Sequence, residues 1–411
     1  MESMGKSYEV YKNFVTEEVS SDVLIETIHP QHRAFTAIYK KNYERSIGGV
    51  RMVTNGTPRE AARLARGMAE KCALNSLPVN GQKCLVICSN QVPENARERA
   101  SIIDYHLNIV KKIEPGVIFG PDMGTPEEIM DLVADEFGHL DNVTGLSRKH
   151  GGLEIDKNGY TAIGAYEAFQ HVAQGKKGLH SVSIQGFGAV GSYFLRLMDL
   201  SEYSIAGISN LRGTLIIKSK KFNKERLLEL FHHTGDDCLE LFALESKFQF
   251  VSDRSCIYKL QADVFIPAAR TTSIAQDAEL NAARNENPEV IGVNDFMRDV
   301  QPGLIIEIAN HPLSYSAEKY LEEHGVLILP DFMVNCGGMI GCYTEWKNRK
   351  TLREKPEEYD HVNEKCKRII IQEMKNNIDE LMDIPGSKRD IANEMMHSRL
   401  KTTIATYKSS S

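Results

Sequence analysis

The sequence predicts an α/β protein built from two domains. The first observation is the order of its segments, because apolar stretches typical of buried strands alternate with amphipathic stretches typical of helices. The second is the length of 411 residues, which at roughly 100–200 residues per domain indicates two separate cores. The third is a glycine-rich turn between a predicted strand and a predicted helix in the second half of the chain.

The composition argues against several other classes of protein. The chain is 42% hydrophobic and 26% charged, and its 49 Lys and Arg against 56 Asp and Glu give a net charge of −7. No excess of positive charge is available to neutralise a nucleic-acid backbone, so we expect no nucleic-acid partner. No apolar run approaches the roughly 20 residues that span a bilayer, and the first residues lack the apolar stretch of a signal peptide. We therefore expect a soluble cytoplasmic protein without a membrane partner.

The eight cysteines are scattered through the chain, without the spacing of a zinc site or a disulfide framework. In a chain of this size they predict reduced, buried thiols. The carboxylates and histidines show no metal-ligand spacing either, so we expect no catalytic metal.

Strand and helix signals alternate through the first half of the chain. Residues 57–74 predict a helix, because Thr57 and Glu60 match the S/T-x-x-E capping box and the apolar residues after them share one face. The next predicted elements are a buried strand at 84–88, a helix near 93–113, a strand at 116–120 and a helix after the loop at 121–128.

A second alternating block follows a glycine-rich connection at 145–159 and predicts a parallel sheet with helices on its faces. Its predicted strands lie within HSVSIQ (180–185), YSIAGIS (203–209), ADVFIPAA (262–269), GLIIEIAN (303–310) and GVLILPD (325–331). We predict that residues 1–150 and the helical segment 346–411 form the first domain, and that residues 151–345 form the second. The apolar stripe on the last helices predicts a core or subunit contact; it comprises Ile371, Met374, Ile378 and Leu381.

The glycine-rich turn carries the sharpest local motif. Gly186, Gly188 and Gly191 satisfy G-x-G-x-x-G directly after an apolar strand and at the start of a helix. Such glycines permit a tight turn, close approach of a pyrophosphate and helix–strand packing, while the helix N-terminus favours the anion. The alternative interpretation is a purely structural turn. We predict dinucleotide binding by the whole segment, which comprises Gly186, Phe187, Gly188, Ala189, Val190 and Gly191.

The choice between NAD and NADP stays open at this stage. The second strand of such a unit usually ends in an acidic residue that binds the adenine ribose of NAD, but here it ends in Ser209 and Asn210. Arg212 follows, with three lysines close behind it, at 218, 220 and 221. These cations are compatible with the 2′-phosphate of NADP, or they form a solvated hairpin face. Asn210 is placed in the predicted cofactor site.

Several dispersed segments, read together, resemble the glutamate/leucine/phenylalanine/valine dehydrogenase family of amino-acid dehydrogenases. They occur in the order and at the spacing of the family, between about residues 33 and 347. The segments are RSIGGVRM (45–52), MAEKCALNSLPVNGQK (68–83), FGPDMGT (119–125), the glycine turn, FIPAA (265–269), IEIANHP (306–312) and LPDFMVNCGGMIGCYTEW (329–346).

The resemblance implies an N-terminal α/β domain for substrate binding and oligomerisation, a Rossmann-type dinucleotide-binding domain, a cleft between them, and a homo-oligomer. It implies that Lys71 binds the substrate α-carboxylate, that Lys83 is the catalytic lysine and that Asp122 shuttles protons. It also places Thr161 near the nicotinamide of NAD or NADP and the Asn310 side chain at the carboxamide, although Asn310 could instead cap a turn. Chemistry supports the first three residue types, since a carboxylate needs a fixed cation and a desolvated lysine beside another cation has a lowered pKa.

The substrate pocket departs from the glutamate-specific members of the family. They resemble K-G-G-x-R at the first motif, where a lysine grips the substrate side chain; here Ile47 takes its place, and Gly49 of the same motif joins the predicted substrate site. Cys342 likewise replaces a serine. A charged side chain buried there unpaired would cost several kcal/mol, so we predict an apolar substrate. The YTEW segment (343–346) and the length instead resemble the glutamate-type branch.

A second departure concerns the loop before the catalytic lysine, which reads LPVNGQK here. Asn80 and Gln82 stand where small residues are usual, and Ile308 stands where glycine is common. The two polar side chains would narrow the site or bind a different substrate.

These observations predict reversible, NAD- or NADP-dependent oxidative deamination of an L-amino acid with an apolar side chain to a 2-oxo acid and ammonia. Two alternatives remain open. One is a glutamate dehydrogenase, and the other is a nucleotide-binding relative without catalytic activity that regulates a partner.

Overall fold

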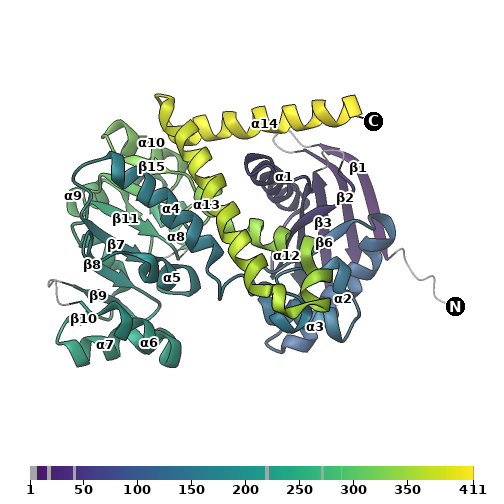
Figure 1. Ribbon diagram of the computed structural model, residues 1–411, viewed down its shortest axis with the longest axis horizontal. Helices are drawn as coiled ribbons and strands as arrows, with labels where there is room; N and C mark the ends of the chain where they lie inside the picture. Colours follow the sequence, from purple (N-terminus) through teal and green to yellow (C-terminus); the bar gives the residue numbers. More distant parts are fainter. Residues whose placement is uncertain are drawn as a thin grey trace. The chain divides into compact units, whose positions relative to one another are not determined.

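A computed structural model describes residues 7–15, 20–39, 43–217, 222–269, 273–287 and 289–410. The chain divides into two compact units. Unit 1 comprises Met1–Asn158, Gly338–Arg368 and Glu394–Ser411, and unit 2 comprises Gly159–Gly337 and Ile369–Asn393. Each unit contains a sheet with helices packed against it, so the predicted α/β class is confirmed (Figure 1).

Unit 1 is built on a six-stranded mixed sheet with the order β1-β2-β3-β5-β4-β6. Its strands are β1 (Tyr8–Val15), β2 (Ser20–Ile28), β3 (His32–Tyr39), β4 (Ser46–Val53), β5 (Asn80–Cys88) and β6 (Val117–Gly120). Its helices include α1 (Pro58–Leu74), α2 (Ala96–Ile113), α3 (Glu127–Asp135) and most of α12 (Gly337–Glu354). Pairing is antiparallel from β1 through β3 to β5, and parallel from β5 through β4 to β6.

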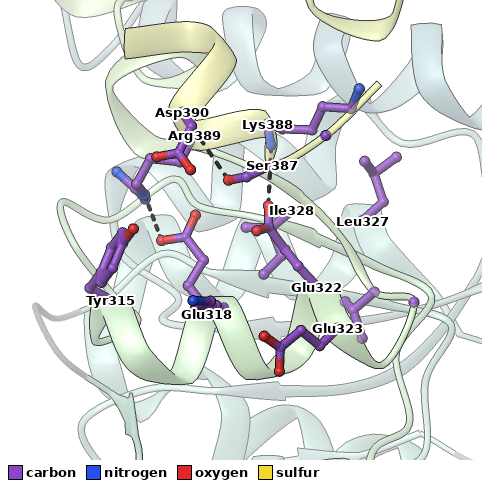
Figure 2. A pocket seen from close by; sticks show the side chains of 14 residues that line it. Tyr315, Glu318, Glu322, Glu323, Leu327, Ile328, Ser387, Lys388, Arg389 and Asp390 are labelled. Carbon is purple, nitrogen blue, oxygen red and sulfur yellow. Dashed lines mark hydrogen bonds and ion pairs between the residues drawn. The ribbon is translucent and has the colours of Figure 1, made fainter. Parts of the chain in front are cut away.

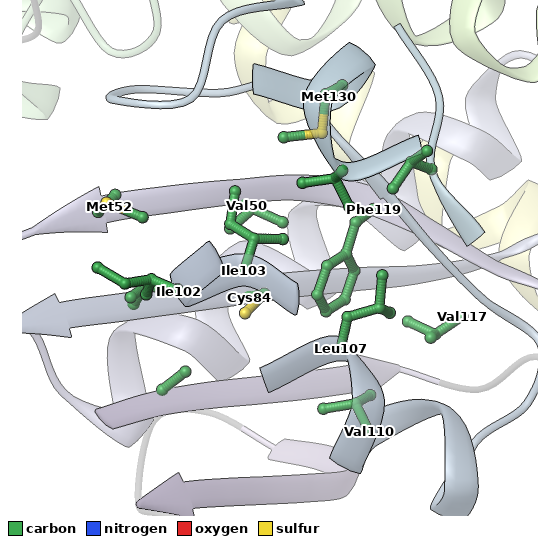
Figure 3. Packing of buried hydrophobic residues seen from close by; sticks show 14 of the residues in the cluster. Val50, Met52, Cys84, Ile102, Ile103, Leu107, Val110, Val117, Phe119 and Met130 are labelled. Atoms are coloured by element: carbon green, nitrogen blue, oxygen red, sulfur yellow. The ribbon is translucent and has the colours of Figure 1, made fainter. Parts of the chain in front are cut away.

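Helix α1 lies very close to the sheet. Its N-terminus is capped as predicted, since Thr57 Oγ1 accepts a hydrogen bond from the Glu60 amide at 3.1 Å. A β-carbon at Gly81 of β5 would lie 2.1 Å from the Ala69 nitrogen and 2.4 Å from the Ala65 carbonyl oxygen. Small residues on both elements therefore bring the helix backbone against β5. On the other face, side chains of α2 and α3 pack with Val50, Cys84 and Phe119 in a buried core (Figure 3).

The predicted loop before Lys83 is part of a central strand. β5 begins at Asn80 rather than at residue 84, because it pairs with β3 on one side and β4 on the other. Lys83 on β5 is paired with Ala37 on the neighbouring strand β3. The lysine is thus carried by a strand that is hydrogen-bonded on both edges, which restricts its position more than a loop would.

Unit 2 contains a seven-stranded sheet with the order β10-β9-β8-β7-β11-β14-β15, as well as a two-stranded pair. Pairing is parallel from β8 through β7, β11 and β14 to β15, while β9 and β10 add antiparallel pairs at one edge. The strands are β7 (Ser181–Gln185), β8 (Ser204–Ser209), β9 (Thr214–Ile216), β10 (Gln249–Val251), β11 (Val264–Pro267), β12 (Ile274–Ala275), β13 (Ile291–Gly292), β14 (Leu304–Ile306) and β15 (Leu327–Leu329). The helices include α4 (Tyr160–Gly175), α5 (Ala189–Leu197), α6 (Lys224–Thr234), α7 (Cys238–Ser246), α8 (Leu280–Glu286), α9 (Val293–Asp299), α10 (Tyr315–Glu323) and α11 (Asp331–Val334).

Residues 369–393 pack with unit 2, whereas the predicted boundaries placed all of 346–411 in the first domain. They include most of α13 (Tyr359–Asp383) and the start of α14 (Lys388–Ser410). Ion pairs join α13 to α4, with Asp379 at 2.8 Å from His171 and Lys375 at 3.4 Å from Glu167. The physical reason is the apolar stripe, of which Met374, Ile378 and Leu381 are fully buried, as the core interpretation predicts.

All eight cysteines lie in the described part of the chain and carry thiols rather than disulfides. Within the described ranges, no three His, Cys, Asp or Glu side chains come together in a group that could hold a metal ion. None of the helices that the structure describes combines the length and the apolar character needed to cross a lipid bilayer.

Candidate active site

A buried cluster of opposite charges forms where β4, β5 and the turn after β6 meet. Lys83 Nζ lies 2.5 Å from Asp122 Oδ2, and Arg51 Nε donates to the same oxygen at 3.1 Å. Only 6% of Lys83 is exposed. The structure therefore brings together two of the predicted site residues, Lys83 and Asp122, and adds Arg51, which the sequence analysis did not single out.

Gly49 makes room for this cluster. A β-carbon at Gly49 would lie 2.8 Å from Asp122 Cβ, closer than real β-carbons approach, and 3.2 Å from Lys83 Nζ, a tight contact. Gly49 pairs with Gly120 of β6 in the parallel register. The predicted substrate residue Gly49 thus borders the ion pair, where only a glycine leaves the space open.

The turn after β6 holds Asp122 in place. Thr125 Oγ1 accepts a hydrogen bond from the Asp122 amide at 3.1 Å and donates to the Val50 carbonyl on β4 at 2.5 Å. The Thr125 amide also donates to the Asp122 carbonyl at 2.9 Å. The P-D-x-G-T segment is therefore a closed turn anchored to the neighbouring strand, and its threonine is the anchor.

Burial and neighbouring charges shift both titrating groups. Burial lowers the pKa of Lys83; Asp122 opposes this shift, while Arg51 and Lys71 add to it. Burial alone would raise the pKa of Asp122, but Lys83 and Arg51 bring it below its ordinary value. The carboxylate is thereby kept charged, and the lysine can release its proton at a lower pH than a solvated lysine.

The remaining predicted substrate residues lie on three different elements of unit 1 and are buried to different depths. Lys71 lies in the last turn of α1 and is half-buried, and its charge acts on Lys83. Ile47 is 2% exposed on β4. Cys342 lies on α12, where burial raises the pKa of its thiol well above the ordinary value. An apolar residue and a neutral thiol thus occupy the two positions where a polar pair was expected for glutamate.

Glu345 anchors the segment that begins at Thr144, after α3, a role that the sequence analysis missed. Its carboxylate accepts hydrogen bonds from the amides of Gly145 at 2.9 Å and Leu153 at 3.0 Å, and from Thr144 Oγ1 at 3.0 Å. Thr144 Oγ1 lies 2.9 Å from the Cys342 carbonyl oxygen. The connection at 145–159 is therefore tied to the YTEW segment of α12.

Asn80 and Gln82 do not narrow the site as expected. Gln82 is fully buried, and its Nε2 donates to the carbonyls of Gly48 at 2.5 Å and Ile118 at 3.1 Å. Since side chains alternate along a strand, Gln82 points to the face opposite Lys83. The Asn80 side chain exchanges two hydrogen bonds with the backbone of Tyr43. The Gln82 side chain thus makes its hydrogen bonds within the sheet, and the Asn80 side chain bonds to the segment that precedes β4.

The glycine turn of unit 2 fits a dinucleotide. Gly186 has a φ of +101°, and a β-carbon there would lie 2.9 Å from the Ala269 nitrogen. A β-carbon at Gly191 would lie 2.0 Å from the Gly186 carbonyl oxygen. At Gly188, by contrast, it would have no heavy atom of the described residues within 4 Å. The outer glycines are thus needed for packing, while the middle one leaves space beside the N-terminus of α5, where a pyrophosphate is favoured.

The end of β8 carries polar groups that are engaged within the protein. Asn210 Nδ2 donates to the Asp236 carbonyl at 2.7 Å, and Asn210 Oδ1 accepts from the Arg212 amide at 2.9 Å. Arg212 is ion-paired with Asp237 at 3.2 Å. The three lysines that were compatible with NADP, at 218, 220 and 221, lie outside the described residues.

The two remaining predicted cofactor residues lie elsewhere in unit 2. Thr161 is in the first turn of α4, and Asn310 follows β14. Asn310 Oδ1 accepts a hydrogen bond from Asn335 Nδ2 at 2.9 Å, and the same amide donates to the Ile308 carbonyl at 3.1 Å. In this arrangement the Asn310 oxygen helps to hold the segment after β14.

Unit 2 contains a second buried charge cluster, which the sequence analysis did not identify, and one of its members, Glu307, lies three residues before Asn310. Arg389 binds three carboxylates: Glu307, Glu318 at 2.5 Å and Asp331 at 3.0 Å. Figure 2 shows Arg389 reaching from the start of α14 to Glu318 on α10, beside a pocket of about 580 Å³. Arg389 is 58 to 82 positions from its partners along the chain, so no local pattern could have connected them.

Comparison with known proteins agrees with this geometry. The sequence model described as "Glutamate/Leucine/Phenylalanine/Valine dehydrogenase" matches residues 151–404, more than half of the chain. The chain belongs to this family. The model described as "Glu/Leu/Phe/Val dehydrogenase, dimerisation domain" matches residues 25–139 of the dehydrogenase. The predicted enzyme class, an NAD(P)-dependent oxidoreductase acting on the CH–NH2 group, is confirmed.

Curated relatives of the dehydrogenase include enzymes of both cofactor specificities. The NAD-specific glutamate dehydrogenase of Staphylococcus aureus (strain COL) is 28% identical over 311 residues, which are 73% of this chain and 68% of that protein. The NADP-specific glutamate dehydrogenase of Saccharolobus shibatae is 27% identical over 376 residues, covering 87% and 78%. Use of NAD or NADP, as predicted, agrees with this family.

Solved structures share the fold of the dehydrogenase. The hetero-hexameric glutamate dehydrogenase of Thermus thermophilus, in a Leu-bound form, aligns with a TM-score of 0.68 at 20% identity, covering 97% of this chain and 89% of that one. A Plasmodium falciparum glutamate dehydrogenase aligns with a TM-score of 0.72 at 15% identity, covering 99% and 84%. At these identities the likeness establishes the fold.

Proposed function

We propose that this dehydrogenase catalyses the reversible oxidative deamination of an L-amino acid to a 2-oxo acid and ammonia. The observation that carries the proposal is the buried Lys83–Asp122 ion pair, held at 2.5 Å over the space left by Gly49. A lysine with a lowered pKa beside a charged carboxylate releases its proton at a lower pH than a solvated lysine does, which suits it to proton transfer.

The nicotinamide of the bound NAD or NADP supplies the hydride acceptor. Lys71 binds the substrate α-carboxylate, which orients the α-carbon. Lys83, in its neutral form, takes a proton from the water that attacks the iminium carbon. Asp122 accepts and returns protons as the amine becomes an imine and then a carbonyl. Thr161, Asn310 and the glycine turn are assigned to cofactor binding on the strength of the family resemblance.

We propose an apolar substrate side chain. Ile47 is 2% exposed and stands at the position where, by the family resemblance, a lysine would bind glutamate. Burial keeps the thiol of Cys342, the other residue assigned to the substrate side chain, neutral. Glutamate is the second candidate, because the curated relatives carry the name glutamate dehydrogenase. A glutamate side chain would need a cation other than residue 47.

Reduction of NAD+ and of NADP+ by each L-amino acid, followed by absorbance, tests the proposal. We expect turnover with leucine, valine or phenylalanine that is lost in Lys83→Ala and kept in Lys350→Ala, whose side chain is 87% exposed. Turnover with glutamate alone would overturn the apolar assignment. In that case Ile47→Lys would raise glutamate turnover only if residue 47 contacts the substrate.

A folded chain that binds nucleotide but oxidises no amino acid would indicate the non-catalytic alternative.

We further propose that the chain forms a homo-oligomer through the region matched by the dimerisation-domain model. Light scattering coupled to size-exclusion chromatography tests this, and a monomer would contradict it. A cytoplasmic location and the assignment of unit 1 to substrate and unit 2 to cofactor stay predictions.

A further inference from the structure

Unit 2 contains a cavity of about 580 Å³ that is lined by α10, by residues of β15 and by the turn between α13 and α14. Small-molecule sites in proteins have volumes of about 300–1,000 Å³, so this cavity is large enough for a small organic ligand. No residue assigned above to the substrate or to the cofactor lines it. Part of the lining is apolar and comprises Val326, Leu327 and Ile328.

One carboxylate in the wall of this cavity is only half satisfied. Glu318 is 3% exposed, and its Oε2 accepts a hydrogen bond from Arg389 Nε at 2.5 Å. Its Oε1 is buried and has no hydrogen-bond partner among the residues that the structure describes. Figure 2 shows the Glu318 side chain extending from α10 toward the start of α14. A buried carboxylate oxygen without a partner is unfavourable, so a hydrogen-bond donor supplied by a ligand would be stabilised there.

The cations that line the cavity do not compensate its carboxylates. Arg389 is already shared by three carboxylates, and burial raises the pKa of Glu318 to about 7 although Arg389 opposes the rise. Lys388 Nζ donates to two backbone carbonyls at the end of α13 and just after it, and Lys319 is exposed to solvent. Three further carboxylates line the cavity, those of Glu322, Glu323 and Asp390. The excess of negative charge favours a cationic ligand.

The lining suits an organic cation better than a metal ion. Over the described ranges, no three His, Cys, Asp or Glu side chains form a group that could hold a metal. Glu318 and Glu322 are four positions apart on α10, so their β-carbons lie about 5–6 Å apart on one face of the helix. The two ammonium groups of a four-carbon diamine have about this separation, and its methylene chain matches the apolar part of the lining.

We propose that this cavity binds a small aliphatic diamine. One ammonium group donates to Glu318 Oε1, the other lies against the Glu322 carboxylate, and the methylene chain packs against Leu327 and Ile328. The proposal does not depend on the proposed function, because no residue of the substrate or cofactor site takes part in it.

Calorimetric titration of the full-length protein with 1,4-diaminobutane, at low ionic strength and without nucleotide or amino acid, tests the proposal. The control ligand is 1,4-butanediol, which has the same chain without the charges. We expect the diamine to bind and the diol not to bind. Glu318→Gln keeps the size of the side chain and removes its charge, and we expect it to weaken diamine binding about tenfold.

Glu322→Gln is a second variant that leaves the buried Arg389 cluster intact. Glu322 Oε1 accepts a hydrogen bond from the Lys388 amide at 3.1 Å, and the side-chain oxygen of glutamine can accept the same bond. We expect this variant also to weaken diamine binding. The matched control is Glu202→Gln, which removes the same charge from an exposed position of unit 2 and should bind the diamine as tightly as the wild type.

Absence of diamine binding to the wild type would overturn the proposal, because solvent would then satisfy the Glu318 oxygen. Equal binding of the diol would overturn it as well, as would an equal loss of affinity in Glu202→Gln. If Glu318→Gln does not fold, Glu322→Gln decides, and an unchanged affinity in that variant would contradict the site.

Discussion

Two buried charge clusters in this dehydrogenase have opposite charge balance, one with more cations than carboxylates and the other with more carboxylates than cations. In unit 1, one carboxylate, Asp122, is shared by Lys83 and Arg51 beside the space left by Gly49. In unit 2, one arginine, Arg389, is shared by three carboxylates. The pKa of Lys83 is lowered, whereas burial raises the pKa of Glu318 to about 7. Burial of charge by itself therefore does not mark an active site; the unit 1 cluster differs because it holds a lysine whose pKa is lowered, which makes its proton easier to release.

The largest expected effect comes from removing the lysine of the unit 1 cluster. Lys83→Ala removes the group that activates water, so kcat/KM should fall about 10²–10⁴-fold. The melting temperature should change little compared with the loss of activity, since the variant removes one buried charge and leaves Asp122 paired with Arg51. Activity close to wild type in a folded variant would show that the pair is structural.

The unit 2 cluster should respond in stability. Arg389→Leu leaves Glu307, Glu318 and Asp331 buried without their common cation, which typically costs about 3–5 kcal/mol of unfolding free energy. Urea denaturation measures the loss. The control is Arg298→Ala, an exposed arginine that pairs with Asp295 and Asp299, for which about 0.5 kcal/mol or less is expected. Equal effects of the two variants would contradict a supporting role of Arg389.

Gly49→Ala tests whether space matters as much as charge in unit 1. The added methyl group would meet Asp122 and Lys83 and displace their pair, at a cost of about 1–3 kcal/mol. Activity should fall more than stability, because the pair loses its geometry. Gly67→Ala on α1 is the matched control: its β-carbon would meet no heavy atom of the described residues within 4 Å, so stability should rise by up to about 1 kcal/mol.

A smaller effect is expected on the pH dependence of stability, to which His32 and Glu318 contribute with opposite sign. Burial lowers the pKa of His32 in unit 1 to about 4 from 6.5, so the unfolded chain takes up more protons and stability is lost as pH falls from 6.5 toward 4. The pKa of Glu318 rises from 4.5 to about 7, so its contribution is present below pH 4.5 and is lost as pH rises through 7. Urea midpoints across this range should have a smaller acid slope in His32→Gln and a smaller neutral slope in Glu318→Gln than in the wild type. Unchanged slopes would contradict these assignments.

Much of the site could be predicted because its residues lie in short motifs. Lys83, Asp122 and Gly49 each sit in a segment whose local pattern carries the resemblance, and the structure places them together. Arg51 and Thr125 belong to the same segments, so attention to the last residue of G-G-V-R and of P-D-M-G-T could have found them. The error at Asn80 and Gln82 arose because the family resemblance placed these residues in a glycine-rich loop, whereas strand pairing on both edges decides the conformation.

The α/β class, the glycine turn and the capped start of α1 could be predicted because each is visible as a pattern along the chain, and the resemblance named Lys83 and Asp122. The three-dimensional structure was needed to show that Arg389 joins Glu307, Glu318 and Asp331, that residues 369–393 pack with unit 2, and that Asp236 lies beside Asn210. These contacts join residues far apart in the chain. Their energy comes from burial and charge pairing, which the order of residues alone does not specify.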